Sequence, residues 1–239
     1  MRTESLRLLN LPALLAGMAK RRASDAGGRG SREVWLGAAY ESLVESGIDA
    51  VRIQPLGKRV ELSRTSFYWF FADREALLEA LLELWREKNT GTLVERASAY
   101  AESVTEAVLN VFDCWLDAAI FDSRFEFAVR SWALQSAEVA AEIERADTAR
   151  IAALSAMFAR FGCSAAAADV RARTIYLTQI GYISMNTRED MATRMGRIPL
   201  YVEIFTGLAP EPKDLNRFRA RHSPAQPVNG FERGDARAA

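Results

Sequence analysis

The sequence contains few of the residues that enzymes use for metal binding or nucleophilic catalysis. It has one histidine, His222, and two cysteines, Cys114 and Cys163, among 239 residues. This scarcity argues against zinc sites, Cys–His nucleophiles and Ser–His–Asp triads. Glycine-rich phosphate-binding motifs and the G-x-S-x-G motif are also missing from the sequence. We therefore expect no enzymatic activity, no catalytic residue, no bound metal and no cofactor.

Long hydrophobic runs are missing as well. No stretch of 18 or more apolar residues occurs, which argues against a membrane-spanning helix. Residues 6–18 are apolar enough to suggest a signal peptide, but Arg7, Asn10 and Pro12 interrupt them and basic residues follow. The two cysteines lie in apolar surroundings typical of free thiols in a reducing compartment. We expect a cytoplasmic protein without a membrane partner; an amphipathic anchor over residues 5–22 is the weaker alternative.

Charge is balanced over the whole chain but not along it. The sequence has 31 basic and 31 acidic residues. Residues 1–74 carry 12 Lys and Arg against 8 Asp and Glu, whereas residues 75–239 carry 19 against 23. A basic N-terminal third on an acidic remainder indicates that one end of the protein contacts a polyanion.

Hydrophobic spacing predicts an all-α fold, because no alternating segment typical of a strand occurs. Residues 1–30 predict a flexible basic extension, and residues 31–74 predict three short helices. Residues 75–208 predict a larger helical bundle, and the Pro-rich residues 209–239 predict a disordered tail. After a helix at 74–88 capped by Asp73, the expected bundle helices are 92–121, 124–136, 137–161, 165–187 and 191–207.

Residues 31–77 carry the most informative pattern. A helix over 53–60, a tight turn and a helix that begins at Ser63 follow the helix-turn-helix plan. The expected small core consists of Leu56, Val60, Leu62, Phe67 and Phe71. The opposite face of the third helix would then present polar and aromatic side chains to solvent.

That face suits contact with DNA. Arginine can read guanine, hydroxyl groups bind phosphate, and aromatic rings contact thymine methyl groups. Residues 52–74 hold five basic side chains and two acidic ones. The predicted DNA-binding residues are Arg52, Lys58, Arg59, Ser63, Arg64, Thr65, Ser66, Tyr68, Trp69 and Arg74. For Trp69, packing against the next helix is an equal alternative, and Arg74 is equally well explained as a solvated residue of a first helical turn.

The same residues resemble a known family. W-L-x-A-A-x-x-x-L-V-E-x-G, followed by L-G-x-x-V-E-L-S-R-T-S-F-Y-W-F-F-x-D-R-E-A-L, resembles the N-terminal DNA-binding domain of TetR/AcrR-type transcriptional regulators. The resemblance implies a recognition helix at 63–70, with Lys58 and Tyr68 on phosphates and Arg64, Thr65 and Trp69 nearest the bases. Two positions depart from the pattern: Glu61 replaces the usual turn glycine, and Phe70 replaces a frequent His or Tyr.

The resemblance also implies a C-terminal bundle that encloses a small-molecule pocket and dimerises through its last two helices. The apolar helices 165–187 and 191–207 agree with such a homodimer, although an ordinary intramolecular core is the alternative. Glu126 and Asp113 are candidates for binding a cationic ligand, or else solvated. The predicted ligand-binding residues, each of which is alternatively a packing residue, are Trp85, Asn89, Phe112, Trp115, Trp132, Gln135, Phe158, Tyr176 and Gln179.

These observations favour a ligand-responsive, sequence-specific transcriptional regulator. The expected form is a homodimeric repressor that a small-molecule effector releases from a pseudo-palindromic double-stranded operator. An activator would have the same sequence features. The alternative is an all-helical ligand-binding protein or enzyme with an incidental helix-turn-helix.

Overall fold

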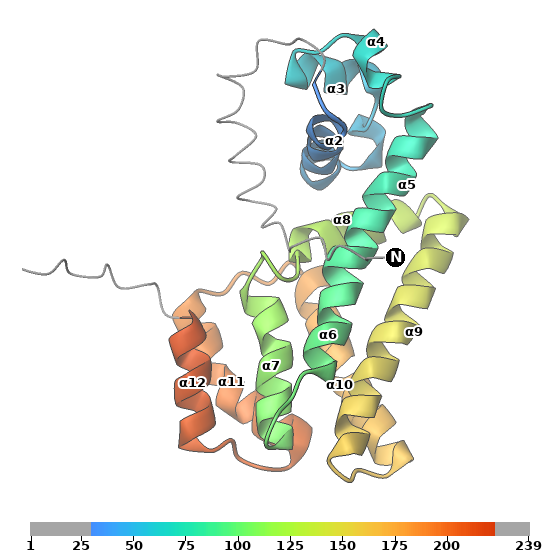
Figure 1. The fold of residues 1–239 in the computed structure, drawn as a ribbon. Helices are drawn as coiled ribbons and strands as arrows, with labels where there is room; N and C mark the ends of the chain where they lie inside the picture. Colours follow the sequence, from blue (N-terminus) through green and yellow to red (C-terminus); the bar gives the residue numbers. More distant parts are fainter. Residues whose placement is uncertain (1–29, 223–239) are drawn as a thin grey trace, which may run out of the picture.

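The computed structural model describes residues 30–222, and within this range the chain is helical without a strand (Figure 1). The prediction of an all-α fold is therefore confirmed for the described residues. A small group of helices lies at one end and a longer bundle at the other, joined by a long helix that runs through both (Figure 1). The predicted flexible extension lies almost wholly outside the described residues.

The N-terminal helices begin and end at residues whose side chains or backbones suit those positions. Ser31 caps the first helix by accepting a hydrogen bond from the Val34 amide, and Gly47 ends it at φ 80°. The helix that follows the tight turn begins after the cap Ser63, as the sequence predicts. Their bounds are α2 Arg32–Ser46, the 3-10 helix η1 Ile48–Ala50, α3 Ile53–Val60 and α4 Arg64–Phe67.

A long helical rod connects the two ends of the molecule (Figure 1). It consists of α5 Arg74–Trp85, the π-helix η2 Arg86–Gly91 and α6 Thr92–Ser98. Asp73 caps its first turn by accepting from the Ala76 amide at 2.8 Å, as predicted. The predicted single helix 92–121 is wrong, because Ala99 is extended at φ −60° and ψ 154° and ends the rod. A separate helix then begins at the cap Ser103.

The remaining helices form the bundle around the rod. Asp122, Ser136, Ser164 and Asp190 each accept a hydrogen bond from a backbone amide in the first turn of the helix that follows. The longest two helices pack against each other as neighbours. Their bounds are α7 Val104–Leu116, α8 Ser123–Ala133, α9 Ala137–Arg160, α10 Ala165–Ser184, α11 Met191–Thr206 and α12 Pro212–His222.

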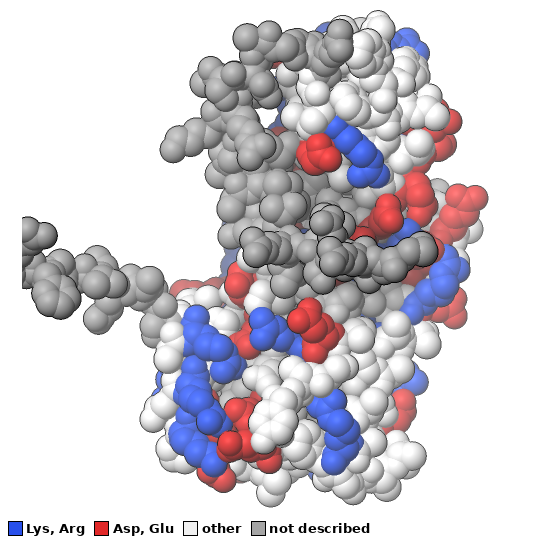
Figure 2. Space-filling view, viewed as in Figure 1, with Lys and Arg blue, Asp and Glu red and all other residues white. Residues whose placement is uncertain are grey.

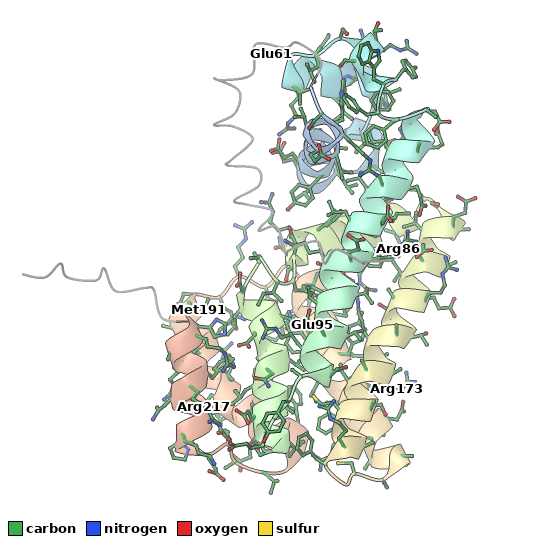
Figure 3. All side chains as sticks on the ribbon, viewed as in Figure 1. Glu61, Arg86, Glu95, Arg173, Met191 and Arg217 are labelled. Atoms are coloured by element: carbon green, nitrogen blue, oxygen red, sulfur yellow. The ribbon has the colours of Figure 1, made fainter. Side chains whose placement is uncertain are left out.

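Helix α12 corrects the prediction of a disordered tail over residues 209–239. Phe218 is 1% exposed in the core against α7, and His222 Nε2 lies 2.8 Å from the Asp113 carboxylate. Arg217 donates to Glu106 of α7 at 2.8 Å, and Lys and Arg side chains gather along α12 (Figures 2 and 3). The polar composition concealed one apolar contact and several ion pairs, which together hold this helix on the bundle. Residues 223–239 lie outside the described residues.

Two hydrophobic cores divide the molecule, and the division does not follow the predicted boundary between residues 74 and 75. The first core joins α2, α3 and α4 to α5, α8 and the beginning of α9. The second core joins α6, α7, α10, α11 and α12 to the rest of α9. The N-terminal helices therefore share buried side chains with the bundle, and a movement of α5 or α8 would carry them along.

Candidate nucleic-acid interface and ligand cavity

The turn between α3 and α4 is tight and depends on close backbone approach. The Leu62 amide donates to the Gly57 carbonyl at 2.9 Å. A Cβ atom added at Gly57 would lie 2.9 Å from the Leu62 carbonyl oxygen, so this position requires glycine. Glu61 adopts the left-handed region at φ 57° and ψ 36°, where the family resemblance placed a glycine (Figure 3).

A small aromatic core fixes α4 against α2 and α3. Phe67 is fully buried, with its ring edge-on to Trp35 at 5.2 Å and stacked on Phe71 at 5.5 Å. Leu56 is fully buried beside them, while Val60 and Leu62 are partly buried. The predicted core is thus confirmed, and it leaves the opposite side of α4 facing solvent.

Four of the ten residues predicted to contact DNA lie on the exposed side of α4 or directly after it. Tyr68 is 46% and Trp69 58% exposed, and Arg64 and Thr65 are also exposed. Arg64 Nη2 donates to the Tyr68 hydroxyl at 2.9 Å, and its guanidinium lies 5.6 Å from the centre of that ring. The α-helix spans Arg64–Phe67 and residues 68–70 continue as turns, so it is shorter than the expected recognition helix.

The two serines of this segment have local roles. Ser63 Oγ accepts from the Ser66 amide at 3.3 Å, and the Ser66 hydroxyl donates to the Ser63 carbonyl at 3.0 Å. Ser66 is buried, so the prediction that it lies on the free face of the helix is wrong. The S-R-T-S spacing explains this result, because a serine three residues after a capping serine turns back toward the cap.

The surrounding basic residues divide into two groups. Arg52, at the start of α3, and Lys58, in its last turn, are exposed. Arg59 instead pairs with Glu41 at 3.0 Å and with Glu45 at 2.8 Å on α2. Arg74 donates to the Val51 carbonyl at 2.7 Å and to the Ile48 carbonyl at 3.3 Å, which ties η1 to the start of α5.

The residues predicted to bind a ligand are not brought together in one cavity. Trp132 is buried in the first core, Gln135 is exposed at the end of α8, and Phe158 is fully buried in the second core. Trp85, Asn89 and Tyr176 belong to a buried polar network. Only Phe112, Trp115 and Gln179 of the predicted residues line a cavity found in the described part of the chain.

The buried polar network, here called the Glu126 network, replaces the expected cavity at the centre of the bundle. Glu126 and Arg150 are both fully buried, with Arg150 Nη1 2.7 Å from Glu126 Oε1. Glu126 Oε2 accepts from Trp85 Nε1 at 2.7 Å and from Asn89 Nδ2 at 2.9 Å. Arg150 also donates to the Tyr176 hydroxyl at 2.9 Å. The network therefore links α5 and η2 of the rod to α8, α9 and α10.

Two further residues complete the network and set its protonation. Arg130 donates to both Glu126 and Asp147, and Tyr176 donates to Asp147 at 2.6 Å. Burial alone would raise the pKa of Glu126, but the charges and hydrogen bonds of Arg150 and Arg130 hold that pKa below its ordinary value. Burial raises the pKa of Tyr176. Glu126 is thus neither solvated nor free to bind a cationic ligand.

Asp113, the other carboxylate considered for a cationic ligand, is also engaged within the protein. It is 3% exposed and lies close to Arg221, Arg96 and the imidazole of His222. Arg221 and His222 were not predicted as partners because residues 209–239 were assigned to a disordered tail, and Arg96 and Arg150 were not predicted because an arginine on a helix is usually solvated. The spacing of the chain carries no signal that would pair them.

A small cavity, partly open to solvent, lies between α7, α10 and α11. The Tyr182 and Tyr201 hydroxyl groups lie 2.9 Å apart on its wall, and the Arg194 guanidinium lies 5.5 Å from the Tyr182 ring centre. Arg197 forms an ion pair with Glu189. The cavity is lined by Phe112, Trp115, Ile175, Thr178, Gln179, Tyr182, Glu189, Arg194, Arg197, Ile198, Tyr201 and Phe205.

The sequence analysis missed most of this lining because it assigned the last two helices to dimerisation. Tyr201 and Phe205 lie one helical turn apart, and their rings stack at 5.6 Å. That spacing indicates a shared inward face and is the signal that the sequence offered. The sequence around the loop residue Glu189 contains no such spacing signal.

The described chain is thus an all-α protein with an N-terminal helix-turn-helix. Residues 36–81 match the family described as bacterial regulatory proteins, tetR family. Over 76 residues the chain is 32% identical to tetracycline repressor protein class G of Vibrio anguillarum. This match covers 31% of the chain and 36% of that relative, so the chain spans about a third of the relative's length. The helix-turn-helix of this chain is therefore a TetR-family domain.

The fold is also similar to those of solved structures. A putative TetR-family transcriptional regulator from Mesorhizobium loti has a TM-score of 0.52 at 12% identity, covering 80% of this chain and 95% of that one. GusR of Salmonella enterica has a TM-score of 0.52 at 17% identity, covering 84% and 96%. A transcriptional regulator from Rhodococcus has a TM-score of 0.51 at 18% identity, and the match covers 82% of this chain and 100% of that one. At these identities the likeness shows the fold.

The length and polarity of the helices also bear on membrane insertion. Within residues 30–222, every helix is too short or too polar to cross a bilayer.

Proposed function

We propose that this protein is a homodimeric transcriptional regulator, acting as a repressor, that binds a pseudo-palindromic operator and releases it when a small molecule binds. The observation that carries the proposal is the exposed side of α4, where Arg64, Thr65, Tyr68 and Trp69 stand on a TetR-family helix-turn-helix. We assign the protein no catalytic role.

On DNA, α4 enters the major groove. Arg64 has the donor geometry that reads the O6 and N7 atoms of guanine, and Thr65 and Trp69 lie on the same exposed side. Lys58 and Arg52, exposed at the two ends of α3, contact phosphates together with the Tyr68 hydroxyl. Arg59 and Arg74 position the helices by their contacts within the domain rather than touch DNA.

Helices α10 and α11 support a homodimer. Each carries a stripe of exposed apolar residues at helical spacing, with Leu177 at 58%, Leu200 at 63% and Ile204 at 71% exposure. Val170, Met185 and Leu208 are exposed on the same two helices or directly after them. Large exposed apolar surface is uncommon on a monomer and marks a site of association. Ile180 of α10 is half-buried and packs against the second core, so it does not belong to the stripe.

The effector binds in the cavity between α7, α10 and α11. Ile175 and Gln179 line that cavity, and Tyr176 on the same helix bonds to Arg150 of the Glu126 network. The network in turn holds Trp85 and Asn89 of the rod that carries α4. Effector binding acts by favouring one position of the rod, because a ligand indifferent to both positions would shift nothing.

The DNA-binding face is tested by selecting bound fragments from the source genome and measuring the affinity of two variants for the selected site. Arg64→Ala should cost about 1–3 kcal/mol and relax preference at one base position. Lys58→Ala should weaken all sequences alike and reduce the salt slope by about one unit. Lys213→Ala, an exposed site on α12, is the control and should change neither. The proposal is wrong if no fragment is enriched, or if neither Arg64→Ala nor Lys58→Ala affects binding.

A further inference from the structure

One carboxylate oxygen in the cavity between α7, α10 and α11 has no hydrogen-bond donor. Among residues 30–222, the buried side-chain polar atoms without a partner are Trp35 Nε1, Lys88 Nζ and Glu189 Oε2. Of these three residues, Glu189 lines the cavity. A buried acceptor left without a donor is unfavourable, and in a native protein it calls for an explanation.

The rest of the Glu189 side chain is fixed. Its other oxygen, Oε1, pairs with Nη1 of Arg197, and the side chain is 13% exposed. Arg197 therefore holds the carboxylate at the cavity wall, while no donor among residues 30–222 reaches Oε2. A hydrogen-bond donor brought by a ligand would satisfy this atom.

The walls select the shape of that ligand. The Phe112 ring lies edge-on to Trp115 at 5.4 Å, and Phe205 stacks on Tyr201 at 5.6 Å. Flat aromatic surfaces of this kind pack well against a planar ring. The cavity is partly open to solvent, so a ring held against these walls can extend out of it.

The charged residues of the lining favour a neutral hydrogen-bond donor over a charged ligand group. Two arginines, Arg194 and Arg197, face one carboxylate, Glu189, so the lining disfavours a cation. An anion is disfavoured as well, because it would lie beside the Glu189 carboxylate, whose charge repels it. An anionic ligand would also leave Glu189 Oε2 without a donor. A neutral hydroxyl group is the donor that remains.

We propose that this cavity binds a neutral monocyclic or bicyclic phenol, whose ring lies among the aromatic walls and whose hydroxyl group donates to Glu189 Oε2. This ligand class rests on the proposed role of the cavity as the effector site. The bond is charge-assisted, and removing the donor from the ligand should therefore have a large effect on affinity.

Titration calorimetry of the full-length protein with four naphthalene probes tests the ligand class. 2-Naphthol supplies the donor, 2-methoxynaphthalene removes it, 2-naphthoate supplies an anion, and 2-naphthylmethylammonium supplies a cation. We expect 2-naphthol to bind at least about tenfold more tightly than 2-methoxynaphthalene, the effect of one hydrogen bond to a charged group.

Glu189→Gln should reduce this preference to about threefold or less, because the acceptor loses its charge. Glu203→Gln, an exposed position on α11 outside the lining, is the matched control and should keep the full preference. The comparison of the four probes on the wild-type protein needs no variant, so it stands even if Glu189→Gln fails to fold.

Equal affinity for 2-naphthol and its methyl ether would overturn the proposal, as would tighter binding of the anion or the cation. Absence of binding by all four probes would overturn it too. Operator binding is measured separately to keep the two proposals apart. 2-Naphthol that binds without releasing DNA contradicts the effector role and leaves the ligand class standing, whereas failure to bind any DNA refutes the regulator while the calorimetry still decides the ligand.

Discussion

Glu126 is the residue whose surroundings say most about stability. Its folded-state pKa lies below the ordinary value of 4.5, since Arg150 and Arg130 outweigh the effect of burial. Between the folded pKa and 4.5 the unfolded chain binds more protons, so the stabilisation is present in full above pH 4.5 and is lost as pH falls through the folded pKa. Glu126→Gln should therefore weaken the loss of stability in acid, measured by denaturant unfolding from about pH 3 to about pH 7.

At neutral pH the same substitution should cost about 3–5 kcal/mol, because Arg150 would remain buried without its counter-charge. Glu203→Gln, on an exposed turn of α11, is the control and should leave both the stability and its pH dependence unchanged. If Glu126→Gln loses stability in acid as steeply as the wild type does, other carboxylates dominate the pH dependence of stability. If that variant does not fold, Trp85→Phe removes a single donor to Glu126 and serves for the same measurement.

Lys88 is the opposite case, a buried charge without a hydrogen-bond partner in the described part of the chain. Its side chain is 9% exposed, and burial lowers its pKa although the charges of Asp122 and Asp117 act in the other direction. Lys88→Met should raise the free energy of unfolding at neutral pH by about 1 kcal/mol. Lys213→Met, at an exposed site, should change it by less than about 0.5 kcal/mol. A destabilised Lys88→Met variant would contradict this account.

The turn of the helix-turn-helix is the element in which the sequence departs from the TetR-family pattern, and the backbone shows the consequence. Glu61 is exposed and holds a left-handed conformation that costs a residue with a Cβ atom about 1–2 kcal/mol. Glu61→Gly should raise the free energy of unfolding by about 0.5–1 kcal/mol, after allowing for the entropy of glycine in the unfolded chain. Glu61→Ala keeps the Cβ atom and should give no such gain. Equal stability of the two variants in denaturant unfolding would show that the turn is not strained.

The elements that could be predicted from sequence are those that local chemistry determines. Ser31, Ser63 and Asp73 cap their helices through bonds to residues three positions on, so spacing alone reveals them. Helix α12 could not be predicted, because Phe218 and His222 gain their stabilisation from α7, more than 100 residues earlier in the chain. The same holds for the site: α4 could be read from a local pattern, whereas Arg150 and Glu189 acquire their roles through residues distant in sequence or placed by a loop.

At the scale of the whole molecule, the exposed apolar stripes on α10 and α11 predict the assembly. Ile204→Glu would bury a charge in the interface, so we expect a monomer in sedimentation at about 10 µM, where the wild type is a dimer. Operator affinity should fall when the dimer is lost, since the binding of one subunit to one half-site is weak. Leu134→Glu, at a site 88% exposed on α8, is the matched control and should remain a dimer. A monomeric wild type at this concentration would refute the dimer.

The last consequence concerns communication between the cavity and α4. The continuous contacts run from Gln179 and Tyr176 on α10 through Arg150 and Glu126 to Trp85 on the rod. Contiguity alone is not coupling, so the path is a hypothesis about which contacts differ between the two positions of the rod. Trp85→Phe keeps the ring but removes the hydrogen bond to Glu126, which still accepts from Asn89 and Arg150.

We expect Trp85→Phe to bind 2-naphthol and operator DNA separately with nearly wild-type affinities. The ratio of probe affinities without and with DNA should fall toward one, whereas coupling of about 1–3 kcal/mol makes that ratio about 5–150 in a wild type that responds. Calorimetry on the free protein and on the DNA complex gives both affinities. Trp132→Phe, a buried indole of the first core that lies outside the network, is the control and should keep the ratio. If the ratio of probe affinities in Trp85→Phe equals that of the wild type, the rod is moved through packing contacts rather than through Glu126.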